Sequence, residues 1–116
     1  MYGMACAYSP DPDRPGKVLL PFDPSTGRID EDVWALWLEH DPVRMAPLHA
    51  QALRSLRRIY LDAGRSDEYF LDIGAQAFSG ELQKLEVEHT LELFDGRHGG
   101  ISYRYPGAVR ELLLAI

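Results

Sequence analysis

The pattern of apolar and polar residues divides the chain into an irregular first half and a regular second half. In the second half, two short apolar runs at residues 58–62 and 89–94 are typical of strands. Residues 67–85 lie between them and have apolar side chains at helical spacing: Phe70, Ile73, Ala77, Phe78, Leu82 and Leu85. A Gly-rich loop at residues 95–102 precedes a closing helix over roughly residues 106–115. This order predicts a βαβα unit with a parallel sheet and right-handed crossovers.

The first half opens with an apolar run from Gly3 to Tyr8 that ends at the turn cluster Ser9-Pro10-Asp11-Pro12. Because the run does not alternate apolar and polar residues, it predicts a strand buried on both faces. A strand that starts without a lead-in is typical of an internal strand of a longer domain. With the two later strands, it predicts an α/β fold with about three parallel strands and flanking helices.

The segment between this run and the βαβα unit is expected to be irregular and then helical. Residues 11–28 contain four prolines and two glycines, which favour loops. Asp30 is a candidate N-cap for a short helix that contains Trp34 and Trp37. Asp41 and Pro42 start a second helical stretch towards Leu56, which Pro47 is expected to break or restart.

Composition narrows the function classes. Twelve basic and eighteen acidic residues give the 116-residue chain a net charge of −6, which argues against nucleic-acid and anionic-membrane binding. No apolar run approaches the roughly 18 residues of a membrane span, and the first residues lack the basic start of a signal peptide. The single cysteine, Cys6, excludes an internal disulfide and a multi-cysteine zinc site. The expectation is a cytoplasmic domain without a metal or another cofactor.

Two loops of the predicted βαβα unit carry candidate chemistry. Functional groups of α/β sheets gather at the carboxyl ends of the strands, where Asp67 follows the first strand and His98 the second. Adjacent parallel strands lie about 4.8 Å apart, so the two side chains are expected to hydrogen-bond. Such a pair is the acid and base of a hydrolytic triad. As alternatives, Asp67 is the N-cap of the following helix, Asp62 braces the strand end, and His98 is an ordinary surface residue.

The residues from Ile59 to Ala115 resemble the C-terminal end of α/β-hydrolase serine esterases, closest to enterochelin esterases and S-formylglutathione hydrolases. In that family, a strand is followed by Asp-x-Gly-x-x-Asp-x-aromatic, matched here by Asp62-Ala-Gly-Arg-Ser-Asp-Glu-Tyr69. The next strand of the family ends in a turn with the catalytic histidine and an aromatic-rich helix start. Here these are Asp95-Gly-Arg-His-Gly-Gly100 and Tyr103-Arg-Tyr105. The family commonly has His-Ser or His-Met-Asn where this chain has His-Gly-Gly.

The resemblance implies that residues 1–116 are the C-terminal part of one α/β-hydrolase domain, a partial α/β-hydrolase fold. Residues 11–56 would be an insert between strands, and residues 57–116 would be the βαβα unit. Asp67 would be the triad acid and His98 the base, in the hydrolysis of small-molecule carboxylic esters or thioesters.

The serine nucleophile of such an enzyme is not found in this sequence. It requires a Gly-x-Ser-x-Gly elbow, and none of the six serines has a glycine both two residues before it and two residues after it. No oxyanion-hole loop is recognisable either. We therefore expect a segment of a serine esterase that is inactive alone and self-associates through an exposed edge strand near Gly3–Tyr8. The alternative is a non-catalytic α/β module for binding or interaction.

The remaining candidates have structural alternatives. Cys6 is a core residue or, less simply, a substitute nucleophile. Trp34 and Trp37 line a ligand pocket or pack against the sheet. Three further histidines, His40, His49 and His89, have no partners at metal-ligand spacing. A basic cluster of Arg54, Arg57 and Arg58 is expected to be a solvated helix end.

Overall fold

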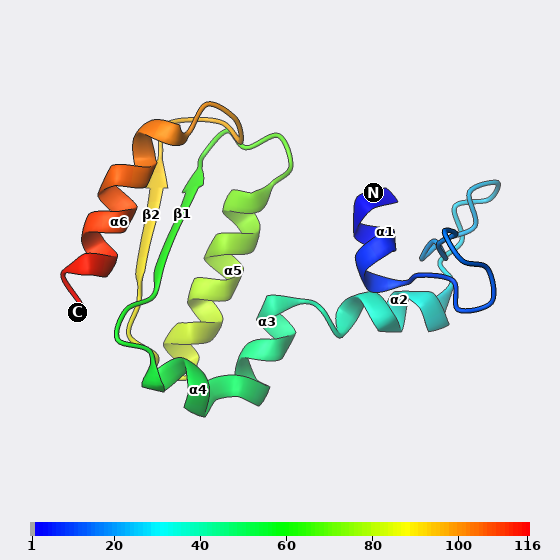
Figure 1. Cartoon of the computed structure of the whole chain (residues 1–116), viewed down its shortest axis with the longest axis horizontal. Coiled ribbons are helices and arrows are strands. Elements are labelled where there is room, and N and C mark those ends of the chain that lie inside the picture. Colours follow the sequence, from blue (N-terminus) through cyan, green and yellow to red (C-terminus); the bar gives the residue numbers. More distant parts are fainter. Residues whose placement is uncertain (1) are drawn as a thin grey trace. The chain divides into compact units, whose positions relative to one another are not determined.

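The computed structural model describes residues 2–116 in two compact units, one that ends at Met45 and one from Ala46 to Ile116 (Figure 1). The first unit is helical and irregular. The second unit contains the sheet and both loops that carry the candidate residues.

The first unit contains α1 (Tyr2–Tyr8), α2 (Glu31–Leu38) and α3 (Pro42–Met45). Between α1 and α2, the chain is irregular and is held by two isolated antiparallel bridges, Pro10 with Val18 and Phe22 with Ile29. The predicted N-cap at Asp30 is confirmed, since its Oδ1 accepts the Val33 N–H at 3.1 Å. Asp41 begins α3 in the same way, accepting the Val43 N–H at 3.0 Å.

The strand expected from Gly3 to Tyr8 is wrong, because these residues form helix α1. The run contains two alanines and one methionine, which favour helices, and has no β-branched residue. Ala5 is fully buried, whereas Cys6 is exposed and is not the core residue that we expected. The edge strand on which the expected self-association depended is therefore not present at this position.

Aromatic side chains hold α1 against α2. The Trp37 indole N–H donates to Ser9 Oγ at 2.8 Å, and the Ser9 hydroxyl donates to the Leu19 carbonyl at 2.8 Å. Tyr8 meets the Trp37 ring edge-on and stacks on the His40 ring, with centroids 4.7 Å apart. Trp37 and His40 are thus packing residues of the first unit.

The second unit contains η1 (Ala46–His49), α4 (Ala50–Ser55), β1 (Tyr60–Gly64), α5 (Leu71–Lys84), β2 (Thr90–Phe94), η2 (Ser102–Arg104) and α6 (Tyr105–Leu113). The strands pair in parallel, so the predicted βαβα order is confirmed. Within residues 2–116, the sheet has two strands, where about three were expected. The helical stretch after Asp41 is broken as predicted, since Pro47 lies in the 3₁₀ turn η1 between α3 and α4.

Two boundaries differ from the expectation. β1 begins at Tyr60 and includes Ala63 and Gly64, which lie beyond the predicted end of the strand at residue 62. α5 begins at Leu71, four residues after the expected start. The apolar stripe of α5 is only partly buried: Leu82 is fully buried, whereas Phe70 and Ile73 are exposed. The buried face is instead centred on Ser79 and Leu82, three residues apart.

The two faces of the sheet differ in polarity. The register pairs Asp62 with Glu92 and Gly64 with Phe94, so these residues and Tyr60 share one face. The other face carries Leu61, Ala63, Leu91 and Leu93. Figure 1 shows α5 and α6 on opposite sides of the two strands. One helix therefore covers an apolar face, and the other covers a face with charged side chains.

The two loops at the carboxyl end of the sheet approach each other so closely that β1 must end in glycine. A Cβ on Gly64 would lie 2.5 Å from the Gly96 carbonyl oxygen and 2.8 Å from the Arg97 carbonyl oxygen. Both neighbours are backbone atoms, so only movement of the loop could relieve the clash. The absence of a side chain at Gly64 thus allows residues 96–97 to lie against the end of β1.

We predict that Gly64→Ala lowers the free energy of unfolding by about 1–3 kcal/mol, the usual cost of forcing an extra carbon into a packed site. Gly74→Ala is the matched control, because a Cβ at this position in α5 would meet nothing within 4 Å. It should raise stability by roughly 0.5–1 kcal/mol, since alanine favours helices over glycine. Urea denaturation measures both changes, and equal effects of the two substitutions would contradict the close approach at Gly64.

Candidate functional site

The loops that carry Asp67 and His98 leave the same edge of the sheet. β1 ends at Gly64 opposite Phe94, the last residue of β2. Backbone pairing continues past both strands: the Arg65 N–H donates to the Phe94 carbonyl at 2.9 Å, and the Ser66 N–H to the Gly96 carbonyl at 2.9 Å. The first turn of each loop is therefore fixed by main-chain hydrogen bonds.

Asp67 and His98 are in hydrogen-bonding contact, as the sequence predicted. Oδ2 of Asp67 lies 3.2 Å from Nδ1 of His98. The Asp67 side chain is 4% exposed, and its Oδ1 accepts the Tyr69 N–H at 2.8 Å. Burial by itself raises the pKa of Asp67, but the hydrogen bonds from the Tyr69 N–H and from His98 outweigh it and hold the pKa below its ordinary value. Asp67 is therefore a carboxylate at neutral pH.

Three consecutive residues of the first loop contact His98. Besides the bond to Asp67, its backbone N–H donates to Glu68 Oε2 at 3.2 Å. The Tyr69 ring meets the imidazole edge-on, with centroids 4.9 Å apart and planes at 78°. Glu68 also lies 3.8 Å from the Arg97 guanidinium. The imidazole is held on one side, yet its side chain is 49% exposed.

The pairing with Asp67 determines the protonation pattern of His98. An ionised carboxylate can only accept hydrogen bonds, so Nδ1 of the neutral imidazole must carry the proton. Nε2 then has a free lone pair, and it makes no hydrogen bond with the part of the chain that the structure describes. This is the state in which a histidine accepts a proton from a nucleophile, with the carboxylate ready to stabilise the imidazolium.

The alternative role of Asp67 as the N-cap of α5 is wrong. The N-cap is Phe70, whose backbone is left-handed at φ 59° and ψ 30°. Bulky residues rarely adopt this conformation, which costs on the order of 1–3 kcal/mol. The Phe70 N–H donates to the Asp67 carbonyl at 3.1 Å, so the loop makes an extra turn before the helix. That turn frees the Asp67 side chain to contact His98.

Asp62 braces the end of the strand, as one of the alternatives from the sequence had it. Its Oδ2 accepts a hydrogen bond from Arg104 Nε at 3.2 Å. It therefore belongs to an ion-pair cluster on the charged face of the sheet, and no contact joins it to His98 in the described residues.

Sequence reasoning missed a second histidine with fixed hydrogen bonds. Nε2 of His89 lies 2.7 Å from Ser79 Oγ, and Nδ1 lies 2.9 Å from the Val87 carbonyl oxygen. A carbonyl oxygen only accepts, so in the neutral imidazole Nδ1 carries the proton and Nε2 accepts from the serine hydroxyl. Ser79 is 4% exposed, which closes it to substrates. The pair ties α5 to the start of β2, and its only sequence signal is a serine one turn before the buried Leu82.

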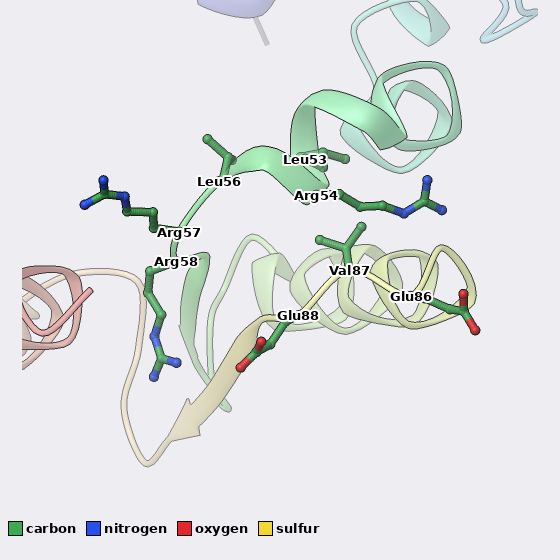
Figure 2. A pocket seen from close by; sticks show the side chains of 8 residues that line it. All are labelled: Leu53, Arg54, Leu56, Arg57, Arg58, Glu86, Val87 and Glu88. Carbon is green, nitrogen blue, oxygen red and sulfur yellow. The ribbon is translucent and has the colours of Figure 1, made fainter. Parts of the chain in front are cut away.

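The basic cluster lines a hollow of about 270 Å³ at the other end of the sheet, with Leu53, Leu56, Glu86, Val87 and Glu88 (Figure 2). The guanidinium groups of Arg54, Arg57 and Arg58 point in different directions. Each also has a partner: Arg54 bonds the Leu85 carbonyl, Arg57 the Ile116 carbonyl and Arg58 the Glu111 carboxylate. Arg54 and Arg57 are exposed at the end of α4 and just after it, as expected of a solvated helix end, whereas Arg58 is half-buried.

Among residues 2–116, no three His, Cys, Asp or Glu side chains are grouped so that they could hold a metal ion. None of the helices in this range has the length and apolar character needed to cross a membrane.

Comparisons with known proteins add no family to this description: no family model matches the chain, and no match was found among curated proteins. The geometry of Asp67 and His98 is therefore the feature of the molecule that points to a function.

The lowered pKa of Asp67 predicts a pH dependence. The pKa of Asp67 is lower in the folded state than in the unfolded state, where it is near 3.8. The ionised side chain therefore stabilises the fold at pH values above the unfolded-state pKa. This stabilisation is lost as the pH falls further, through the folded-state pKa. Between about pH 5 and pH 2, the free energy of unfolding should fall less steeply for Asp67→Asn than for the wild type. Urea denaturation at several pH values measures the slopes.

Asp95→Asn is the control for this prediction, because Asp95 is an exposed carboxylate in the neighbouring loop. It should keep the slope of the wild type. A wild-type slope in Asp67→Asn as well would contradict the pairing with His98.

Proposed function

We propose that this chain supplies the acid and base of a Ser-His-Asp esterase that hydrolyses small-molecule carboxylic esters or thioesters. The observation that carries the proposal is the 3.2 Å contact between a buried Asp67 carboxylate and a half-exposed His98 imidazole. In the proposal, the chain is the C-terminal segment of an α/β-hydrolase domain, and the serine and oxyanion hole come from sequence outside these 116 residues. A cytoplasmic location belongs to the same proposal.

The proposed reaction follows from the protonation of His98. Nε2 takes the proton of the serine hydroxyl while the serine oxygen attacks the carbonyl carbon of the ester. The resulting imidazolium, stabilised by Asp67, gives that proton to the leaving alcohol or thiol as the carbon–heteroatom bond breaks. Water then attacks the acyl-enzyme, with Nε2 taking its proton and returning it to the serine oxygen. Asp67 stays ionised throughout and keeps the imidazole oriented.

Local geometry supports this role over an incidental loop contact. The imidazole contacts Asp67 through a side-chain atom, Glu68 through the backbone and Tyr69 through its ring. Pre-positioning of a base removes part of the entropic cost of reaching the transition state. A surface histidine without function would need none of these three contacts.

The isolated chain should not react with a fluorophosphonate probe, because its six serines lack the activated elbow. Intact-mass analysis after incubation measures the labelling. Stoichiometric labelling of the 116-residue chain would contradict the proposal in its present form.

The positive test uses the coding DNA. A reading frame that continues upstream and encodes Gly-x-Ser-x-Gly would supply the nucleophile.

In that longer protein, Asp67→Asn should lower kcat for a small ester by roughly 10⁴-fold, as expected when the base loses its correct tautomer. His89→Gln is the matched control and should leave kcat within a few fold. An upstream frame without a serine elbow would favour a non-catalytic module instead.

A further inference from the structure

Arg104 lies where the His98 loop returns to the sheet. The loop leaves β2 at Phe94 and ends at η2 (Ser102–Arg104). Three of its residues are glycines, and Gly100 adopts φ +72°. Glycine has the largest backbone freedom to lose, so such a loop holds its histidine in one place only if both ends are fixed.

The first end of the loop is fixed by the strand pairing and the second by Arg104. Its Nε donates to Asp62 Oδ2 at 3.2 Å, and its Nη2 donates to the Tyr60 hydroxyl at 3.1 Å and forms an ion pair with Glu92 Oε2 at 2.7 Å. The guanidinium carbon also lies 4.6 Å from the centroid of the Phe94 ring. One side chain thus reaches both strands, on the charged face of the sheet.

The cluster is partly buried and electrostatically coupled. The Arg104 side chain is 18% exposed and that of Asp62 is 22% exposed. The hydrogen bonds from Tyr60 and Arg104 lower the pKa of Glu92, whereas burial and the Glu92 carboxylate raise the pKa of Tyr60 to about 12. Arginine suits this position because its fork can serve both carboxylates at once, which a lysine ammonium cannot do as well.

From these contacts we infer that Arg104 is a positioning residue for His98: it fixes the second end of the loop and thereby keeps the imidazole on Asp67. The inference rests on the proposed function, in which the Asp67–His98 pair is the reactive one. Arg104 acts through the loop, since its described contacts are with the sheet and not with the imidazole.

The test is the tautomer of His98, observed by long-range ¹H–¹⁵N correlation of the histidine side chains. The spectra are recorded on the full chain at about pH 8.5, where imidazoles are neutral. The wild type should show the Nδ1–H tautomer at His98. In Arg104→Gln this signature should shift towards the Nε2–H form that a free imidazole prefers, and in Arg104→Lys the shift should be intermediate.

His89 is an internal control, because its Nδ1–H is held by the Val87 carbonyl away from the His98 loop. It should keep its tautomer in all variants. Arg58→Gln is the matched control variant, since it removes a different arginine ion pair, the one between Arg58 and Glu111 of α6, and should leave His98 unchanged.

Three other outcomes would contradict either the positioning role of Arg104 or the proposed function. A folded Arg104→Gln that keeps the Nδ1–H form at His98 would overturn the positioning role. Simultaneous loss of the His89 signature in both Arg104 variants would also overturn it, because Arg104 would then support the whole fold. A wild type without the Nδ1–H form at His98 would instead contradict the proposed function.

Discussion

The parallel pairing of β1 and β2 is the constraint on which the candidate site depends. Because Gly64 and Phe94 are opposite each other, both strands end at one level, and the two following loops start side by side. The hydrogen bonds from Arg65 and Ser66 extend the pairing into the loops. Asp67 and His98 are 31 residues apart in sequence, yet this short sheet brings them within 3.2 Å.

Much of this arrangement could be predicted from sequence because it follows from local patterns. Short apolar runs with turn residues define β1 and β2, and carboxyl ends of adjacent parallel strands share one edge. The prediction of a strand from Gly3 to Tyr8 was wrong because the pattern of a short apolar segment fits a buried strand and a helix equally well. Its alanines and methionine were the better guide, and α1 is the result.

The rest depends on side chains that meet across long sequence distances without a local signal. Nothing in the pattern around Arg104 indicates that it reaches Asp62, 42 residues earlier. The left-handed Phe70, which releases Asp67 from the helix start, is equally invisible, since bulky residues seldom adopt that conformation. The charged face of the sheet and the geometry of the loops could therefore not be predicted from the sequence.

A one-dimensional proton spectrum would show whether the Asp67 carboxylate holds the Nδ1 proton of His98. The chain should give a low-field imidazole N–H resonance from His98 that disappears in Asp67→Ala and remains in Glu68→Gln, which alters the contacts of Glu68 with the His98 backbone and Arg97 but not the Nδ1 contact. A spectrum in which Asp67→Ala keeps this resonance would contradict that role of the carboxylate.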